Sequence, residues 1–314
     1  MTHPTLGRWG GLILLIVVVA ALPLILPNKF YYDIAIKTGL NALVCVGLNL
    51  LIGYAGQISL GHSAFFALGG YASAVLTTRY EWNGFVAMGV GAVVTGILAY
   101  LVARPILRLK GHYLAMATLA FGIIISLVLN REIWLTGGPD GITVPTLRLG
   151  DMRLRSPETW YWITGGALVV VTFLALNLIH SPAGRAIRAL HGSEVAAETL
   201  GIDVARTKTM VFVLSAVIAA VAGSLFAHAD RFITPNEAGF LRSVELVTMV
   251  VLGGMASTFG AIVGAALLTI LPQALAGFDE FKHIVLGAIL VGTMIFLPKG
   301  LVPSLGALIR RGRR

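Results

Sequence analysis

Charged residues are scarce in this sequence of 314 residues. Asp, Glu, Lys and Arg together make up 12% of the chain, whereas 57% is hydrophobic and the mean hydropathy is +0.88. This composition excludes an ordinary soluble protein. The apolar residues gather in runs of about 20, the length with which an α-helix crosses the hydrocarbon core of a bilayer. The sequence therefore predicts an integral membrane protein with a single membrane domain, residues 1–314, and no sizeable soluble domain.

Cysteine and catalytic motifs are also lacking. The single cysteine, Cys45, lies inside an apolar run, which excludes an intrachain disulfide and a cysteine metal cluster. The sequence has no Gly-x-x-x-x-Gly-Lys-Ser/Thr phosphate loop, no His-Glu-x-x-His zinc motif and no Gly-x-Ser-x-Gly nucleophile elbow. His62, His228 and Asp230 are too scattered to form a catalytic group. We expect no enzyme activity, catalytic residue, metal or cofactor in this chain.

The apolar runs predict how many helices cross the membrane. One of them, residues 244–276, is too long for a single span, and small residues from Gly253 to Gly260 interrupt it, which favours two short helices joined by a tight turn. We therefore expect an all-α, polytopic bundle of about ten transmembrane helices, or eight or nine if some runs are re-entrant. The first run is interpreted as an anchor. The runs lie near residues 11–27, 34–52, 62–78, 84–103, 112–130, 160–180, 209–228, 244–276 and 282–298.

The net charge of +9 comes from basic residues at the ends of these runs. Such positions orient membrane spans, so we expect a lipid bilayer and no nucleic acid as the partner. Basic clusters occupy residues 104–110, the segment 182–208 and the tail 299–314. The positive-inside rule places them, with both termini, on the cytoplasmic side. The loop 131–159 then lies outside, either as a cap that receives a ligand or as a solvated hairpin.

The polar segment 182–208 stands between two long apolar runs and suggests a docking surface for a soluble partner. Ser193 can cap a helix, Glu194 lies in its first turn, and Gly201 can end it in the left-handed conformation. A short cytoplasmic helix from Ser193 to Leu200 is expected, with Arg185 and Arg188 supporting it. The candidate coupling residues are Arg185, Arg188, Ser193, Glu194, Glu198 and Gly201.

Polar residues and glycines also break the apolar pattern at residues 53–63. Irregular backbone at membrane depth survives when it is buried in protein or lines a wet cavity, so this break is either part of a pathway or an ordinary turn. Glu245 follows Arg242 by three residues at the edge of an apolar run, and either pairs with it or faces the pathway. The candidate pathway residues are Gln57, Ser59, His62, Ser63, Glu245, Gly253 and Gly254.

Four separated stretches resemble, in the same order, the LivM-type permeases of branched-chain amino acid ABC importers. They are residues 53–66, 136–141, 184–202 and 249–255, and the resemblance extends over roughly residues 34–300. One departure is Ala256, where the family often has a further glycine. The resemblance implies a fold like that of type II ABC importers in the bacterial inner membrane. It also implies a homologous, LivH-like second permease, two cytoplasmic ATPase subunits, a periplasmic or extracellular binding protein, and a coupling helix at Ser193–Gly201.

Residues and resemblance together predict the permease subunit of an ATP-driven importer for branched-chain or related amino acids. The subunit forms half of the pathway, while ATP is used by partner subunits. The sequence does not decide whether the transported substrate is a branched-chain amino acid, another amino acid, urea or a short amide. An ion-coupled secondary transporter is the main rival, although apart from Glu245 the spans carry almost no carboxylate. A membrane-embedded enzyme is the other.

Overall fold

The computed structural model describes residues 4–25, 27–149, 152–274, 287, 291–292 and 300–304. Apart from residues 287, 291 and 292, the predicted run 282–298 lies outside the described residues, as does the tail beyond residue 304. The helices are α1 (Pro4–Ala21), α2 (Lys29–Asn49), α3 (His62–Arg79), α4 (Gly84–Ile106), α5 (His112–Arg131), α6 (Ile133–Thr136), α7 (Pro157–His180), α8 (Pro182–Gly192), α9 (Glu194–Thr199), α10 (Val204–Asp230), α11 (Phe240–Gly253) and α12 (Thr258–Ala274).

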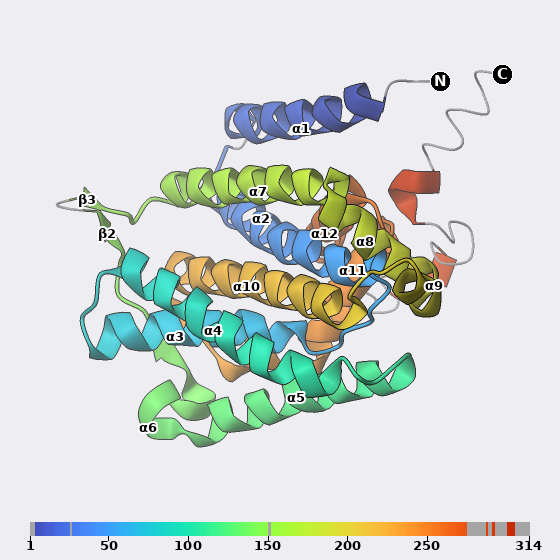
Figure 1. Cartoon of the computed structure of the whole chain (residues 1–314). Helices are drawn as coiled ribbons and strands as arrows, with labels where there is room; N and C mark the ends of the chain where they lie inside the picture. Colours follow the sequence, from blue (N-terminus) through green and yellow to red (C-terminus); the bar gives the residue numbers. More distant parts are fainter. Residues whose placement is uncertain are drawn as a thin grey trace.

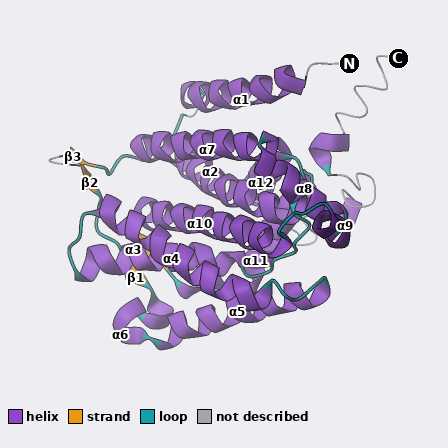
Figure 2. Cartoon of the chain, in the orientation of Figure 1, coloured by secondary structure: helices purple, strands orange, loops and turns teal. Residues whose placement is uncertain are grey.

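Short turns and strands complete the described part of the chain. The single-turn helices are η1 (Leu22–Leu24), the π-helix η2 (Leu50–Tyr54), η3 (Gly138–Asp140) and η4 (Pro235–Ala238). The strands, of two residues each, are β1 (Ile142–Thr143), β2 (Arg148–Leu149), β3 (Met152–Arg153) and β4 (Phe232–Ile233). Figure 2 shows how small the strand content is, so the predicted all-α class is confirmed.

Long apolar helices dominate the architecture. Within the described residues, five segments are long and apolar enough to cross a membrane, namely Lys29–Tyr54, α4, α5, α7 and α10. They run roughly along one direction, with α8 and α9 at one end of the bundle and β2 and β3 at the other (Figure 1). We call these the α9 end and the hairpin end. The structure thus shows a helical bundle, while the predicted count of ten spans stays a prediction.

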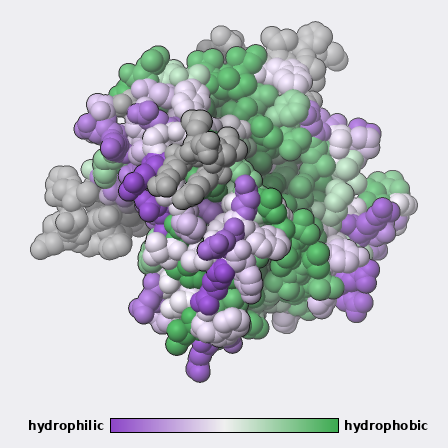
Figure 3. Space-filling model, turned by 90° about the vertical axis from the view of Figure 1, so that its left-hand side faces the viewer, coloured by the Kyte–Doolittle hydropathy of each residue, from purple (hydrophilic) through white to green (hydrophobic). Residues whose placement is uncertain are grey.

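The core of the bundle lies where α2 and α10 meet. Most of each helix is buried, whereas α4 and α5 expose most of their surface. The exposed side chains in the middle of α4 and α5 are apolar, as with Val93, Ile97 and Ile124. Such a surface is suited to lipid. Seen from the hairpin end, hydrophilic residues gather beside a broad band of hydrophobic ones (Figure 3).

Small residues let the inner helices approach closely. A Cβ added at Gly223 on α10 would lie 1.8 Å from the backbone oxygen of Phe66 on α3. Next to this contact, Ser224 Oγ donates a hydrogen bond of 2.8 Å to the carbonyl of Gly69. Backbone contact of this kind is how membrane helices pack in the absence of a hydrophobic driving force between them. It fixes α3, which carries the candidate His62 and Ser63, against α10.

The run 244–276 forms two short helices, as the sequence predicts. α11 ends at Gly253 and α12 begins at Thr258. Gly254 has φ +126°, and Ala256, at φ +57°, donates its backbone N–H to Asn49 Oδ1 at 3.0 Å. The turn therefore sits against the last residues of α2, near the α9 end.

Before α11 the chain re-enters the bundle. α10 ends at the hairpin end, where β4 pairs with β1, and η4 then leads inward. At the start of α11, the Gly239 carbonyl accepts a hydrogen bond of 3.1 Å from Ser63 Oγ. With 14 residues, α11 is about 21 Å long and covers only part of the bilayer thickness. Its first turn lies beside the middle of the span Lys29–Tyr54, because Arg242 contacts Asn41 there.

The loop 131–159 lies at the hairpin end, opposite α9 (Figure 1). It contains α6, η3 and three of the short strands. Ile142 in β1 pairs with Ile233 in β4, and Arg148 in β2 pairs with Arg153 in β3. The segment Thr136–Gly141 thus turns the chain onto the end of α10.

Candidate translocation and coupling sites

The broken segment 53–63 joins α2 to α3 near the α9 end. The π-helix η2 loosens the end of α2, and residues 55–61 follow without helical structure. Its backbone finds partners inside the bundle: Gln57 N donates to the Leu51 carbonyl and Leu60 N to Thr118 Oγ1, each at 3.0 Å. Irregular backbone at this depth is thus satisfied by protein groups.

All four polar candidates of this segment are buried inside the subunit. Gln57, Ser59, His62 and Ser63 expose 3% of their surface or less. Among the described residues, neither side-chain atom of the Gln57 amide has a hydrogen-bond partner. None of the four side chains lies at the subunit surface, and their place in a pathway stays a prediction.

His62 is held on both ring nitrogens. Nδ1 lies 2.8 Å from Ser59 Oγ and Nε2 lies 2.7 Å from Ser215 Oγ. The rings of Phe65 and Phe212 stand edge-on to it, with centroids 5.7 and 6.0 Å away. This environment fits a hydrogen-bonded structural histidine that ties α3 to α10.

Ser63 connects the broken segment to α11. Its Oγ lies 2.6 Å from Ser243 Oγ, and its backbone N–H also donates to that hydroxyl at 3.2 Å. Both serines are buried. The start of α3 and the first turn of α11 are therefore fixed to each other.

A group of polar side chains surrounds Arg242, one residue before Ser243. The guanidinium donates from Nη1 to Glu245 Oε2 at 2.7 Å and from Nη2 to Asn41 Oδ1 at 2.5 Å. Glu237 Oε2 lies 3.5 Å from Arg242 Nε. Asn41 in turn donates from Nδ2 to Thr269 Oγ1 at 2.9 Å. We call these five residues the Arg242 network; it joins α2, η4, α11 and α12.

The Arg242 network lies near the middle of the candidate span Lys29–Tyr54. Asn41 is the thirteenth residue of the 26-residue span Lys29–Tyr54, so it is about 18–20 Å from either end. On the outward side of α11, the Glu245 side chain is 45% exposed and Leu241 is 80% exposed. A carboxylate at this depth is strongly disfavoured in contact with lipid tails. The face of α11 that carries Leu241 and Glu245 is therefore a candidate contact with protein or water rather than with lipid tails.

Glu245 pairs with Arg242, as one of the two interpretations predicts, and its place in a pathway stays a prediction. Asn41, Glu237 and Thr269 were not expected from the sequence as members of this network. The spacing of Glu237, Arg242 and Glu245 was the available signal, because three charges close together in an otherwise uncharged region point to a common network.

The segment 182–208 forms two helices at the α9 end. α9 begins after Ser193, whose Oγ accepts a hydrogen bond of 3.2 Å from Ala196 N. It ends at Gly201, which has φ +79°. Gly201 N donates to the Glu198 carbonyl at 2.9 Å and Ile202 N to the Ala197 carbonyl at 3.1 Å. These two bonds define a Schellman motif, so the structure contains the capped helix that the sequence predicts.

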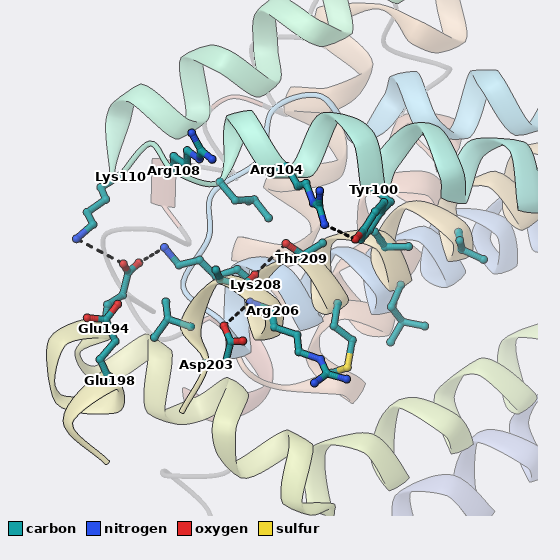
Figure 4. Close-up of a pocket in the computed structure, with 17 residues that line it drawn as sticks. Tyr100, Arg104, Arg108, Lys110, Glu194, Glu198, Asp203, Arg206, Lys208 and Thr209 are labelled. Carbon is teal, nitrogen blue, oxygen red and sulfur yellow. Dashed lines mark hydrogen bonds and ion pairs between the residues drawn. The ribbon is translucent and has the colours of Figure 1, made fainter. Parts of the chain in front are cut away.

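α9 presents two kinds of surface. Glu194 faces inward, where it forms ion pairs with the buried Lys208 of α10 and, at 3.7 Å, with Lys110 (Figure 4). Away from the bundle, Val195 is 67% exposed and Leu200 is 78% exposed. The candidates Arg185, Arg188, Ser193 and Glu198 are also exposed.

A separate helix at Pro182–Gly192, α8, was not expected from the sequence. Ser181 caps it by accepting a hydrogen bond of 3.2 Å from Gly184 N, and Pro182 occupies its first position. Ile187 and Leu190 form its buried side. The Ser-Pro start and this three-residue spacing were available as signals. At its end, His191 lies against Gly56, where an added Cβ would be 3.0 Å from the His191 Nδ1 atom.

The hairpin end carries a cavity of about 790 Å³ beside residues 77–84 and 143–147. His228 lines this cavity, and its Nε2 is hydrogen-bonded to Ser73 Oγ at 2.8 Å. Among the described residues, no group of three or more His, Cys, Asp or Glu is placed to hold a metal ion.

Comparison with known proteins identifies the family. Residues 30–294 match the family described as branched-chain amino acid transport system, permease component. The high-affinity branched-chain amino acid transport permease LivM of Salmonella typhimurium and that of Escherichia coli K12 are each 33% identical to this chain, over 93% of it and 74% of the relative. The permease LivH of Escherichia coli K12 is 28% identical over 83% of this chain and 90% of its own.

No solved structure matches the chain significantly. The match to the family covers most of the sequence and includes the broken segment, α8, α9 and α11. The chain therefore belongs to the family of permease components of branched-chain amino acid transport systems.

Proposed function

We propose that this chain is the permease subunit of an ATP-driven importer of branched-chain or related amino acids. It forms half of a translocation pathway with a LivH-like second permease, and α9 receives the motion of a cytoplasmic ATPase. The observation that carries this proposal is the exposed, charged face of α11 at mid-membrane depth, because a subunit that acted alone in lipid would leave Glu245 facing acyl chains.

A second permease supplies the neighbour that this face requires. Leu241 and Glu245 lie one turn apart, so the face offers an apolar contact beside a charged network. A zwitterionic amino acid carries one ammonium and one carboxylate group. Arg242 and the two carboxylates of the network match both, while Leu241 suits an apolar side chain.

The α9 surface supplies the contact to the ATPase. Val195 and Leu200 are large apolar side chains exposed on a polar helix outside the bundle, which is typical of a protein interface. Glu194 anchors the other side of α9 to Lys208, so a push on α9 is passed to α10. ATP is used by the partner subunits, and this chain needs no cofactor of its own.

A continuous set of contacts links α9 to the Arg242 network. α8 packs on the broken segment where His191 meets Gly56. The broken segment holds α11 through Ser63 and Ser243. Arg242 is the neighbour of Ser243 in the chain. Displacement of α8 and α9 therefore moves the start of α11, which gives Gln57, Ser59, His62 and Ser63 a role as the mechanical link in the pathway.

The test uses vesicles that contain this chain, the second permease, both ATPases and the binding protein. We expect the vesicles to take up labelled leucine, isoleucine or valine only when ATP is present on the side of the membrane that carries the ATPase subunits. Uptake driven by an ion gradient without ATP would support the secondary transporter instead. Preference for urea or acetamide over all three amino acids would keep the permease role and replace the substrate class.

A further inference from the structure

A wedge-shaped groove opens at the α9 end between α4 and α10. Its volume is about 1010 Å³. The two helices approach closely at Gly96, where an added Cβ would lie 3.0 Å from Val217 Cγ2. The residues that line the groove include Tyr100, Arg104 and Arg206 (Figure 4).

The dimensions of the groove match one leaflet of a bilayer. Residues 206–217 of α10 span about 16 Å along the helix axis, and the hydrocarbon core of one leaflet is about 15 Å thick. Its inner part is lined by apolar side chains, whereas the charged residues lie at its mouth. The apolar lining consists of Leu107, Val204, Met210, Val213, Leu214 and Val217.

The charges at the mouth leave a positive excess. Glu194 is engaged by Lys208 and Lys110, and Asp203 Oδ1 accepts the backbone N–H of Arg206 at 2.9 Å. The lining therefore keeps a positive excess, with five basic side chains against the three carboxylates of Glu194, Glu198 and Asp203. Three guanidinium groups of this lining form no ion pair among the described residues: Arg104, Arg108 and Arg206.

Contacts with Tyr100 fix the position of the Arg104 side chain in the groove. Its Nη2 donates to the Tyr100 hydroxyl at 2.9 Å, and its guanidinium lies over the Tyr100 ring at 5.1 Å from the centroid. This stacking fixes the side chain along the groove while leaving its other N–H groups available. A guanidinium fork of this kind is suited to a phosphate.

We propose that the groove between α4 and α10 binds one anionic phospholipid, with its phosphate at Arg104 in the basic mouth and one acyl chain along Met210, Val213 and Val217. Basic pockets between helices at the cytoplasmic surface favour anionic lipid head groups. Because Lys208 and Glu194 also line the groove, the lipid lies beside the ion pair that holds α9 to α10. The site does not depend on the transported substrate.

The test compares phosphatidylglycerol with phosphatidylcholine on the purified importer complex by native mass spectrometry, after titration with an equal mixture of the two lipids. The variants are Arg104→Gln, Arg206→Gln and the double variant. Arg131→Gln is the matched control, since it removes one exposed charge at the other end of α5. We expect the preference for phosphatidylglycerol to fall about fivefold for each groove arginine removed, and to stay unchanged in the control.

Two further arms separate the alternatives. Val213→Trp fills the apolar part and is expected to reduce retention of both lipids, while an excess of inorganic phosphate is expected to leave bound phosphatidylglycerol in place. An unchanged lipid preference in the double variant overturns the proposal. Complete displacement by inorganic phosphate also overturns it, in favour of a free-anion site. Loss of the ATPase subunits from the double variant with an unchanged lipid ratio would assign the groove to a protein contact.

Discussion

A substitution at Gly201 tests the proposed role of α9 most directly. It closes α9 with φ +79°, a conformation that side chains with a branched Cβ strongly disfavour. A Cβ added at this position meets no atom within 4 Å. Gly201→Val therefore creates no clash, and its whole effect comes from the backbone conformation and the two hydrogen bonds of the cap.

The magnitude follows from these terms. A non-glycine residue held in the left-handed region costs about 1–3 kcal/mol. α9 has only six residues and cannot keep its helical form by itself, so this cost is not absorbed locally. At about 2 kcal/mol, the ratio of formed to unformed cap falls roughly 30-fold. We expect substrate-stimulated ATP hydrolysis and uptake to fall together, while membrane insertion is retained.

The assay measures both activities in membranes with matched amounts of permease. Gly192→Val is the matched control, because Gly192 also has no atom near an added Cβ, but it lies at the end of α8 without a positive φ. Gly201→Asn is expected to restore most of the coupling, since asparagine tolerates the left-handed region. Normal uptake by Gly201→Val would refute the role assigned to α9.

Three further predictions concern stability, each read from the heat-induced unfolding midpoint of the purified complex. Arg242→Gln should destabilise the complex by about 1–3 kcal/mol, less than the loss of a fully buried pair, because both side chains are partly exposed. Adding Glu245→Gln should recover part of this loss. Equal stability of the single and double variants would contradict the prediction. Ala256→Gly should stabilise by about 0.5–1 kcal/mol by relieving φ +57°, and a lower midpoint would be the opposite result. Gly223→Ala should cost about 1–3 kcal/mol or more because the added Cβ meets backbone, whereas Gly166→Ala, with no atom within 4 Å, should be neutral or stabilising; similar effects would exclude backbone contact as the cause.

The cap of α9 was predictable because its signals are local. A serine at the start, an acidic residue in the first turn and a glycine at the end each act on their own backbone neighbours, so Ser193, Glu194 and Gly201 could be read in order. The break at Gly253 was predictable for a similar reason, since the length of the run cannot fit one span.

The depth of Glu245 was not predictable in this way. Hydropathy places a residue by its distance from the edge of an apolar run, which puts Glu245 at the membrane surface. The chain instead re-enters through β4 and η4, so that α11 starts at mid-depth beside Asn41. The burial of Gln57 and His62 also depends on contacts from α10 and the start of α11, which lie far away in the sequence.

The proposed mechanism requires that the exposed face of α11 borders a wet pathway between two permeases. This is tested by labelling Leu241→Cys with a membrane-impermeant maleimide in the assembled importer, in a Cys45→Ala background, with and without trapped nucleotide. Val93→Cys on α4 is the control, because it is similarly exposed but lies on an apolar face at comparable depth. We predict that Leu241→Cys is labelled in at least one state and that Val93→Cys is labelled in neither. Absence of labelling at Leu241→Cys in both states, with unimpaired uptake, would contradict the account.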